Sequence, residues 1–580
     1  MNSLEYLTYT SKYETLNRED FTTQIKINLV TNFTDDILKN ILIGICLSNN
    51  IYPIIYKTPY RQYHLDLKNT SSELHANNPD VTFLFFDINP FKDSEFRSSQ
   101  DHFKEILFDI ERYCQATAKT VVLSNFILSY QSAYGNLFLH NPFFNLVNEY
   151  NQKFKGLAAR LPNLTILDTN QLIHFLGESR TFDLRGLYVF DIPFTHEFMT
   201  LLADEWFAYI RALIGKSKKC IVVDLDNTLW GGIVGEVGPT NIALGPDYPG
   251  NVFLYFQHAL LDFYNRGIIL AINSKNNPED VREVFEKNPY MVLKEQHFSA
   301  IRINWDDKTD NLIDIAKELN IGTDSIVFLD DDPLTRAIVK DRLPEVNVPY
   351  FSVPPEDYIK ILYGLNMFHQ FSLTEEDKKK GKMYTEEKQR KEVQKTVKNI
   401  NEYIAELNIV VQVSMDAVSL LPRLSQLTQK TNQFNLTTKR YTESQIKKLI
   451  EDGGLVFSAN ISDKFGNYGT VIMAIIIPDL PNKNDAALDI FLMSCRVMGR
   501  GIEYVFMDYL AKNLDMHGFK TLHAVFAPTA KNKPAEAFLS DHGFTAENKK
   551  SDNMAKKFSL DISRYTKQPC PKLNKTIKIT

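Results

Sequence analysis

Two aspartates stand directly after an apolar run near the middle of the chain. The stretch Ile221–Gly232 reads IVVDLDNTLWGG and places Asp224 and Asp226 after three branched apolar residues, with one leucine between them. Burying a carboxylate without a partner is costly, so a positive group must lie beside these two. That group is either a salt-bridge partner or a bound metal ion.

Further polar residues follow the ends of other predicted strands. Ser274 follows IILAIN, Asp330 and Asp331 follow SIVFL, and Lys308 precedes an amphipathic helix. The carboxyl ends of parallel strands lie along one edge of a sheet, where ligands bind. Four carboxylates at such an edge repel one another unless a divalent cation lies among them, and an all-oxygen site suits Mg²⁺. The pattern therefore favours a metal over a salt bridge.

These residue types suit phosphoryl chemistry. One aspartate can attack phosphorus and form an aspartyl-phosphate, and a second, two residues on, can protonate the leaving oxygen and then activate water. A serine hydroxyl and a lysine can hold phosphoryl oxygens, while Mg²⁺ offsets the negative charge. The alternative is a purely structural carboxylate cluster. Four features in order, each after a strand or before a helix, favour catalysis.

The elements that must position these residues indicate a multidomain α/β protein. Before residue 200, the strand-like runs IKINLVTNF, YPIIYK, VTFLFFDI and TVVLSNF alternate with helical segments at 35–48 and 102–117, which predicts a parallel sheet. A second α/β series runs from Cys220 to about Pro355. The charged segment Thr374–Glu406 predicts a solvated connecting helix. The runs after it predict a more antiparallel α+β domain that ends near Ser563.

Composition excludes several classes of function. A net charge of -6 and a pI near 6.1 give no basic field for nucleic acid, and no apolar run approaches the roughly 18 residues that span a bilayer. The beginning of the chain, MNSLEYLTYTSKYE, has no signal-peptide pattern. The cysteines Cys46, Cys114, Cys220, Cys495 and Cys570 are scattered and form neither a metal cluster nor a disulfide framework. We expect a cytoplasmic protein with reduced thiols and no membrane partner.

Four segments resemble the motifs of the haloacid dehalogenase (HAD) superfamily: DLDNTLWGG, NSKNN, NWDDK and FLDDDP. Their sequences are similar to the corresponding segments of FkbH-like proteins. Three later segments are also similar to that family: LTQKTNQFNLTTKRYT (Leu427–Thr442), DKFGNYG (Asp463–Gly469) and MSCRVMGRGIE (Met493–Glu503). The resemblance covers about Ser217 to Phe544.

The resemblance assigns a role to each matching residue. It implies that Asp224 is the nucleophile and that Asp226 is the acid/base, with Asp226 also coordinating Mg²⁺ through its backbone carbonyl. Asp224 and either Asp330 or Asp331 would complete the metal site, and the sequence leaves open which of the last two is the direct ligand. On the substrate side, Thr228 would shape the turn, Ser274 would bind phosphate and Lys308 would neutralise it. Asp332 stands where the family's DDNP has asparagine.

The C-terminal domain resembles the GCN5-related N-acetyltransferase (GNAT) fold. Its loop has the spacing R-x-x-G-x-G between a strand and a helix, where backbone N–H groups can approach a phosphate. The candidate phosphopantetheine-binding residues are Arg496, Gly499, Arg500 and Gly501. Cys495 directly precedes this loop, and a helix N-terminus favours a thiolate, so it is a candidate acyl carrier. The alternative is a small core residue at a strand end.

The N-terminal pattern is similar to the SGNH-hydrolase-like domain that precedes the HAD unit in many FkbH-like proteins. Its first strand lacks the G-D-S of a working hydrolase, and Asp191 and His196 are too far apart for D-x-x-H. We expect a scaffold or docking domain. The expected domains are SGNH-like (1–215), HAD-like Rossmannoid (216–370), a charged helical linker (371–406), GNAT-like α+β (407–565) and an irregular tail (566–580).

The resemblance implies an enzyme with two sites. FkbH-like proteins take a phosphoglyceryl group from 1,3-bisphosphoglycerate, remove phosphate and load glyceryl onto the phosphopantetheine thiol of an acyl carrier protein. The cofactors would be Mg²⁺ and phosphopantetheine, from a carrier protein or CoA. A second hypothesis joins a phosphatase to an acyl-CoA transferase in polysaccharide or sugar biosynthesis. A third is a carrier-binding scaffold with vestigial sites, which the intact acidic and basic residues argue against.

Overall fold

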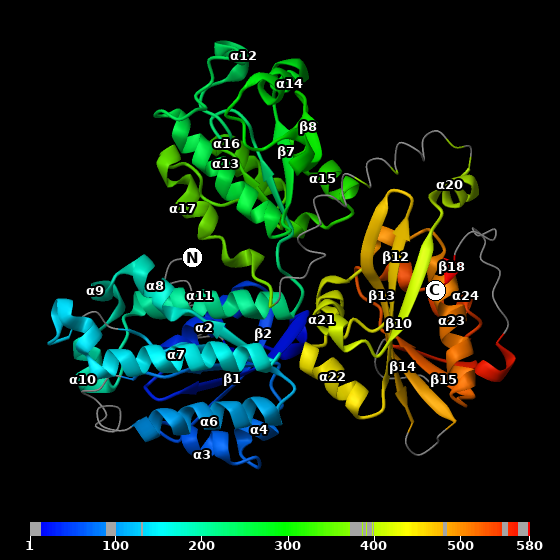
Figure 1. Ribbon diagram of the computed structural model, residues 1–580, viewed down its shortest axis with the longest axis horizontal. Coiled ribbons are helices and arrows are strands. Elements are labelled where there is room, and N and C mark those ends of the chain that lie inside the picture. The colour runs from blue at the N-terminus through cyan, green and yellow to red at the C-terminus, as the bar shows by residue number, and fades with distance from the viewer. Residues whose placement is uncertain are drawn as a thin grey trace. The chain divides into compact units, whose positions relative to one another are not determined.

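The computed structural model describes residues 13–88, 100–128, 132–371, 386, 390, 397, 399–479, 484–547, 555–565 and 578–579. It divides the chain into two compact units. Figure 1 labels the helices and strands of both units. The N-terminal unit comprises Met1–Arg211 with Tyr441–Lys448, and the second unit comprises Ala212–Arg440 with Leu449–Thr580. Among the described residues, none of the helices combines the length and apolar character needed to span a membrane.

The N-terminal unit contains a five-stranded parallel sheet in the order β2-β1-β3-β4-β5. The strands are β1 (Thr23–Thr31), β2 (Ile51–Lys57), β3 (Val81–Phe85), β4 (Thr120–Ser124) and β5 (Leu164–Leu167). Every residue of β3 and β4 is buried, which is expected where helices cover both faces of a sheet. The predicted parallel sheet is therefore present, and β5 is a strand that the sequence pattern missed.

Helices cover both faces of this sheet. α6 (Gln100–Ala116) and α7 (Pro142–Arg160) pack on one face in a core with β4. On the other face, α11 (His196–Leu213) places the Trp206 ring 4.7 Å from that of Phe83. The shorter helices are α2 (Asp36–Ser48), α3 (Tyr63–Lys68), α4 (Glu73–Ala76), α8 (Thr169–Leu176), α9 (Glu178–Thr181) and α10 (Leu184–Phe190).

The second unit begins with a four-stranded parallel sheet in the order β8-β7-β6-β9. Its strands are β6 (Cys220–Val223), β7 (Ile269–Ser274), β8 (Phe298–Ile303) and β9 (Ile326–Leu329). Alternate residues of β6 enter different cores, Ile221 and Val223 on one face and Cys220 and Val222 on the other. The surrounding helices are α12 (Val234–Val237), α13 (Gly250–Asn265), α14 (Pro278–Lys287), α15 (Lys308–Glu318), α16 (Pro333–Arg342) and α17 (Tyr358–Tyr363). This is the predicted Rossmannoid sheet, with β8 missed.

A mixed sheet of nine strands forms the rest of this unit. Its main path is β16-β17-β15-β14-β13-β12-β10-β18, and β11 (Phe434–Asn435) pairs with β14. The strands are β10 (Val410–Met415), β12 (Leu455–Asp463), β13 (Gly466–Pro478), β14 (Asp485–Met493), β15 (Thr521–Phe526), β16 (Thr545–Ala546), β17 (Lys556–Asp561) and β18 (Lys578–Ile579). The helices between them are α20 (Ile400–Leu407), α21 (Leu421–Lys430), α22 (Glu443–Glu451), α23 (Ile502–Met516) and α24 (Phe538–Asp541). The chain is therefore a multidomain α/β protein.

Two segments differ from their sequence patterns. The tail, expected to be irregular, contributes β18, which pairs with Val410 and Val411 in parallel; two residues are too short to give a recognisable alternation. Most of the expected linker helix lies outside the described residues. Within it, Arg390 is 1% exposed rather than solvated, because a buried carboxylate pairs with it.

Candidate active site at the carboxyl edge of the four-stranded sheet

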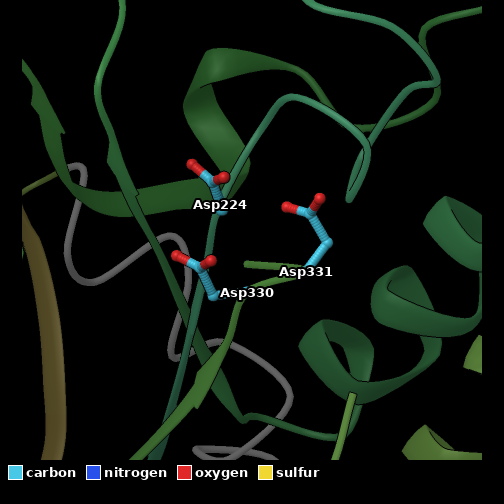
Figure 2. Close-up of side chains that lie close together, drawn as sticks. All are labelled: Asp224, Asp330 and Asp331. Atoms are coloured by element: carbon cyan, nitrogen blue, oxygen red, sulfur yellow. The ribbon is translucent and has the colours of Figure 1, made fainter. Parts of the chain in front are cut away.

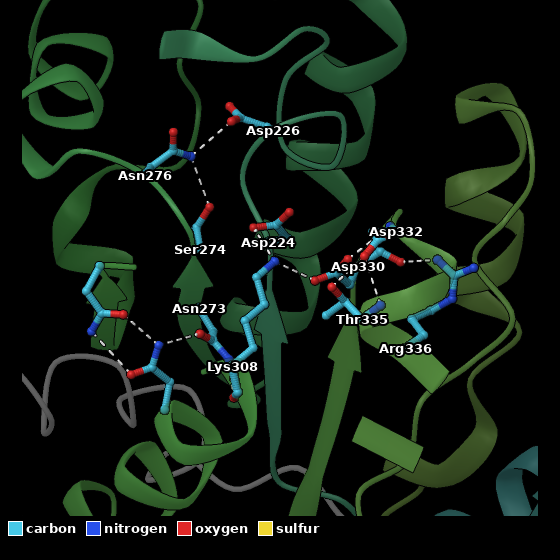
Figure 3. Close-up of polar contacts among 12 residues, drawn as sticks. Asp224, Asp226, Asn273, Ser274, Asn276, Lys308, Asp330, Asp332, Thr335 and Arg336 are labelled. Atoms are coloured by element: carbon cyan, nitrogen blue, oxygen red, sulfur yellow. Dashed lines mark hydrogen bonds and ion pairs between the residues drawn. The ribbon is translucent and has the colours of Figure 1, made fainter. Parts of the chain in front are cut away.

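The parallel register brings the acidic residues together. Val223 and Leu329 are partners at the ends of β6 and β9, and the backbone N–H of Asp224 donates to the carbonyl of Leu329 at 2.9 Å. Asp224 and Asp330, the next residue in each chain segment, therefore lie side by side. Ser274 ends β7, and Lys308 begins α15. The sheet thus gathers residues from four separate segments at one edge (Figure 3).

Lys308 is a positive group beside Asp224. Its Nζ lies 3.0 Å from Asp224 Oδ1 and donates to Asp330 Oδ2 at 2.6 Å. Burial lowers the pKa of Lys308, but the two carboxylates raise it more, so the net shift is upward and the ammonium is retained. A salt bridge is therefore present at this edge. A salt bridge and a metal were exclusive alternatives in the sequence-based prediction, and the salt bridge found here does not decide between them.

One lysine does not balance the charge of this edge. Asp224, Asp330 and Asp331 each place a carboxylate oxygen within 4.8 Å of the others (Figure 2). Burial raises the pKa of Asp330 to about 6, with Asp224 adding to the shift and Lys308 opposing it. Burial, Asp224 and Asp330 likewise raise the pKa of Asp331 to about 6. Three oxygen donors in a region short of positive charge fit a hard divalent cation such as Mg²⁺.

The two neighbouring aspartates differ in their contacts. Asp330 is fully buried, and its Oδ1 accepts the N–H of Asp332 at 3.0 Å while Oδ2 accepts Lys308. Asp331 is half-buried and belongs to the three-carboxylate group, and no other side chain in the described part of the chain forms a hydrogen bond or ion pair with its carboxylate. Asp331 therefore has the freer oxygens for direct metal binding, whereas Asp330 fixes Lys308.

Asp226 is held apart from the three-carboxylate group. Its Oδ1 accepts Trp230 Nε1 at 2.9 Å and the N–H of Val234 at 3.1 Å, and its Oδ2 accepts Asn276 Nδ2 at 3.0 Å. These three donors fix the orientation of the carboxylate. Both of its carboxylate oxygens are thus occupied by protein donors, and Asp226 is not one of the three grouped carboxylates.

Ser274 and Asn276 form the polar side of the site. Ser274 is 1% exposed, and its Oγ accepts Asn276 Nδ2 at 3.1 Å. Asn276 thus connects Ser274 with Asp226 and is a site residue that sequence reasoning missed. Its position in the quoted NSKNN motif, two residues after Ser274, was the available signal.

The turn after β6 is shaped mainly by Asn227 rather than by Thr228. Asn227 has a φ of 53°, its Oδ1 accepts the N–H of Gly232 at 2.9 Å, and its carbonyl accepts the Tyr358 hydroxyl at 2.9 Å. The Thr228 hydroxyl is buried and makes no hydrogen bond within the described part of the chain. Asparagine tolerates this left-handed conformation better than most residues.

A network of asparagines and one arginine supports the site from behind. Asn273 donates to the carbonyl of Lys308 at 2.9 Å and accepts from Asn311 at 3.1 Å. Arg336, which is 4% exposed, donates to the carbonyl of Asp330 and to Ser352 Oγ. These contacts join residues 6 to 38 positions apart in the sequence, so no local sequence pattern revealed them.

The R-x-x-G-x-G segment joins β14 to α23, as the sequence predicts. Gly499 and Gly501 have φ values of 77° and 73°, a conformation that glycine adopts without strain. Arg496 is half-buried, and its Nε donates to Ser494 Oγ at 3.4 Å. Arg500 instead points into the core, where it donates to the Tyr468 hydroxyl and lies 4.8 Å from the centre of that ring. Arg496, not Arg500, therefore has the more accessible guanidinium.

The strands beside this loop diverge. β14 and β15 pair in parallel from Asp485 with Thr521 to Leu488 with Ala524, and not beyond. Later residues of β14 pair with β11 instead: Leu492 with Asn435 and Met493 with Phe434. A ligand that needs the free edge of β14 must therefore displace β11.

Cys495 opens the short turn Cys495–Val497 and is half-buried, whereas Cys220 is fully buried at the start of β6.

The polar segment Leu427–Thr442 uses many of its side chains for its own structure. Thr442 and Gln445 exchange hydrogen bonds at 3.3 and 2.7 Å, which is a capping box at the start of α22. Asn435 Oδ1 accepts the N–H groups of Thr437 and Thr438 at 3.3 and 2.9 Å. These contacts form a capped junction between the loop and the helix.

One solved structure resembles the greater part of the chain. The N-terminal part of the protein BF1531 from Bacteroides fragilis, described as containing a phosphatase domain complexed with Mg, is 28% identical, with a TM-score of 0.60 over 64% of this chain and 100% of that chain. No protein-family model and no curated protein matches.

Acetyltransferases also match, more weakly. The GNAT domain of S. lividans PAT is 16% identical, with a TM-score of 0.22 over 26% of this chain and 89% of that chain. The ribosomal-protein-S18-alanine N-acetyltransferase from Escherichia coli is 18% identical, with a TM-score of 0.21 over 26% of this chain and 94% of that chain.

Proposed function

We propose that this protein is a Mg²⁺-dependent phosphatase of the HAD type that also transfers an acyl group. The observation that carries the proposal is Lys308 between Asp224 and Asp330, with Asp331 beside them. The Bacteroides structure, with its phosphatase domain and Mg, supports the same chemistry. A purely structural ion pair would need one carboxylate for one lysine, and this edge gathers three.

In the proposed reaction, Asp224 attacks phosphorus and forms an aspartyl-phosphate. Asp226 gives a proton to the leaving oxygen and then removes one from the attacking water. Trp230 and Asn276 hold its carboxylate in place for both steps. Bound Mg²⁺ would supply the charge that lets a phosphate dianion approach carboxylates. Asp224, Asp331 and the Asp226 backbone carbonyl would hold it.

The remaining residues bind the phosphoryl group. The Ser274 hydroxyl accepts from Asn276 at 3.1 Å, so its own proton can be donated to a phosphoryl oxygen. Lys308 neutralises charge that builds up beside Asp224, to which it is already paired at 3.0 Å. Each of these groups is buried and held by the protein before substrate arrives, which reduces the reorganisation that the reaction requires.

For the C-terminal domain we propose contact with a phosphopantetheine arm. Arg496 would pair with its phosphate, and the backbone N–H groups around Gly499 and Gly501 would donate to it. The arm would belong to an acyl carrier protein that receives a glyceryl group derived from 1,3-bisphosphoglycerate, with Cys495 as the candidate relay. The pairing of β11 with β14 favours contact at the loop over insertion between the strands. The alternative is an acyl-CoA transferase that acts on a sugar.

Asp224→Asn tests the phosphatase. The substitution keeps the shape of the side chain but removes the nucleophile, so phosphate release should fall by several orders of magnitude while the fold is retained. The measurement is phosphate release from acetyl phosphate with and without Mg²⁺, with circular dichroism to check the fold. Near-normal turnover by the folded variant would contradict the assignment.

A further inference from the structure

The N-terminal unit has a cleft of about 530 Å³. It is lined by Thr34, Tyr60, Arg61 and the five residues 187–191. Thr34 follows β1, and Tyr60 and Arg61 follow β2, so two of its walls stand at the carboxyl edge of the parallel sheet. Ligands of open α/β sheets bind at this edge, and the volume lies in the usual range for ligand sites.

Hydrogen bonds hold the walls of the cleft together. Thr34 donates from its N–H to the carbonyl of Asp191 at 2.9 Å and from its hydroxyl to the carbonyl of Phe190 at 3.0 Å. The Tyr60 hydroxyl donates to the Asp191 carboxylate. Three segments that are far apart in the sequence are thus tied to one another, so the cleft is preformed.

Two residues of the cleft have unusual backbone conformations. Arg61 and Asp191 both have a φ of 57°, in the left-handed region. An arginine there is strained relative to glycine, and such strain gathers at ligand-binding sites. At position 61 the protein keeps a guanidinium where glycine would fold with less strain.

The side chains of the cleft define the chemistry of its ligand. Tyr60, Tyr188 and Phe190 are 50%, 75% and 64% exposed. Rings this open cannot enclose an alkyl chain, but each offers an apolar face to a ligand whose other side stays in water. The Arg61 guanidinium lies 5.2 Å from the centre of the Tyr60 ring, and no ion pair among the described residues joins it to a carboxylate. The Asp191 carboxylate of the same cleft accepts the Tyr60 hydroxyl instead. A guanidinium in this position suits a carboxylate or phosphate.

We propose that this cleft binds an anionic sugar, a ring with one apolar face and one carboxylate or phosphate. The aromatic side chains take the ring and Arg61 takes the charge. This site is independent of the phosphatase residues, which belong to the second unit. It gives the N-terminal unit a binding function without the hydrolytic residues that its sequence lacks.

The test is saturation-transfer NMR on the full-length protein with glucuronic acid and, separately, glucose 6-phosphate. Glucose provides the ring without charge, and acetate provides the charge without a ring. Saturation-transfer signal that is lost in the Arg61→Ala variant is assigned to the cleft. Signal that this variant keeps is assigned to other sites, such as glucose 6-phosphate bound at the phosphatase site. We expect cleft affinity for at least one anionic sugar to exceed that for glucose by about tenfold or more, the effect of one charge-assisted bond. It should also exceed the affinity for acetate, which lacks the ring.

Variants separate binding from folding. Tyr188→Ala and Phe190→Ala should each weaken sugar binding, whereas Phe175→Ala, which removes another aromatic ring that is 62% exposed, should not. Arg61→Gly should lose binding yet unfold at the same or a higher temperature, because glycine adopts this φ freely. Absence of sugar binding, equal binding by Arg61→Ala, or equal affinity for acetate and glucuronic acid would overturn the proposal.

Discussion

Four aspartates in and beside the site differ in what each one contacts. Asp330 holds the lysine from a fully buried position, Asp224 shares that lysine, and Asp331 has the freer oxygens. Asp332 lies outside the site as the N-cap of α16, where its carboxylate accepts the N–H groups of Leu334 and Thr335 at 3.3 and 2.8 Å. Three consecutive aspartates thus have three different roles.

Asp331→Asn should abolish tight Mg²⁺ binding, because it removes the negative charge of a carboxylate that would bind the cation. The matched control is Asp332→Asn, one residue on, which should bind Mg²⁺ normally because asparagine is an equally good N-cap. Isothermal titration with Mg²⁺ measures both. Tight binding by Asp331→Asn would return the direct-ligand role to Asp330. Asp332→Ala should instead lower the free energy of unfolding by about 1 kcal/mol.

Mg²⁺ affinity should depend on pH with a midpoint near 6. The pKa values of Asp330 and Asp331 are raised to about 6, so protons compete with the cation below that pH and both carboxylates are ionised above it. Affinity should therefore fall as the pH is lowered from 7 to 5, by about tenfold per pH unit for each group that protonates. A flat profile, measured by titration at five pH values, would contradict this.

At the scale of elements, the hairpin between β12 and β13 is fixed by a buried ion pair. Asp463 accepts Arg390 Nε and Nη2 at 2.7 and 2.9 Å and the Tyr468 hydroxyl at 2.7 Å. The Arg390 guanidinium lies 4.1 Å from the centre of the Tyr468 ring, which Arg500 also contacts. This arrangement connects the DKFGNYG motif with the glycine-containing loop through one aromatic side chain.

Arg390→Met should lower the free energy of unfolding by about 3–5 kcal/mol, because it leaves the buried Asp463 carboxylate without its cation. The control is Lys464→Met, which lies on the same hairpin and removes an exposed ion pair between Lys464 and Glu406 of α20. It should change the free energy of unfolding by no more than about 1 kcal/mol. Urea denaturation of both variants provides the comparison. Equal losses would show that burial of the pair is unimportant.

At the scale of the whole molecule, the phosphatase site and the glycine-containing loop belong to different sheets. Arg496→Ala should therefore weaken CoA or carrier binding by about tenfold to a hundredfold, the loss expected for one charge-assisted bond to phosphate, and leave phosphate release from acetyl phosphate unchanged. Calorimetry with CoA and a phosphate-release assay measure the two effects. Unchanged CoA and carrier affinity would remove the loop from the proposed function.

The sequence by itself determined most of the strands and the order of the acidic motifs. Continuous apolar runs such as Ile221–Val223 are buried on both faces, so burial and pattern agree, and polar residues after such runs must gather at one edge. β5 and β8 were missed because they are short or include partly exposed residues such as Thr165 and Arg302. β18 was missed because it has only two residues.

Tertiary structure alone decided the partners of these residues. That Lys308 bridges Asp224 and Asp330, that Asn276 joins Ser274 to Asp226, and that Arg500 turns inward to Tyr468 all depend on contacts between distant segments. The same is true of the cleft around Arg61, whose walls come from positions 34, 60–61 and 187–191. Local patterns report periodicity and burial, whereas a site also requires the side chains that other strands and helices bring beside it.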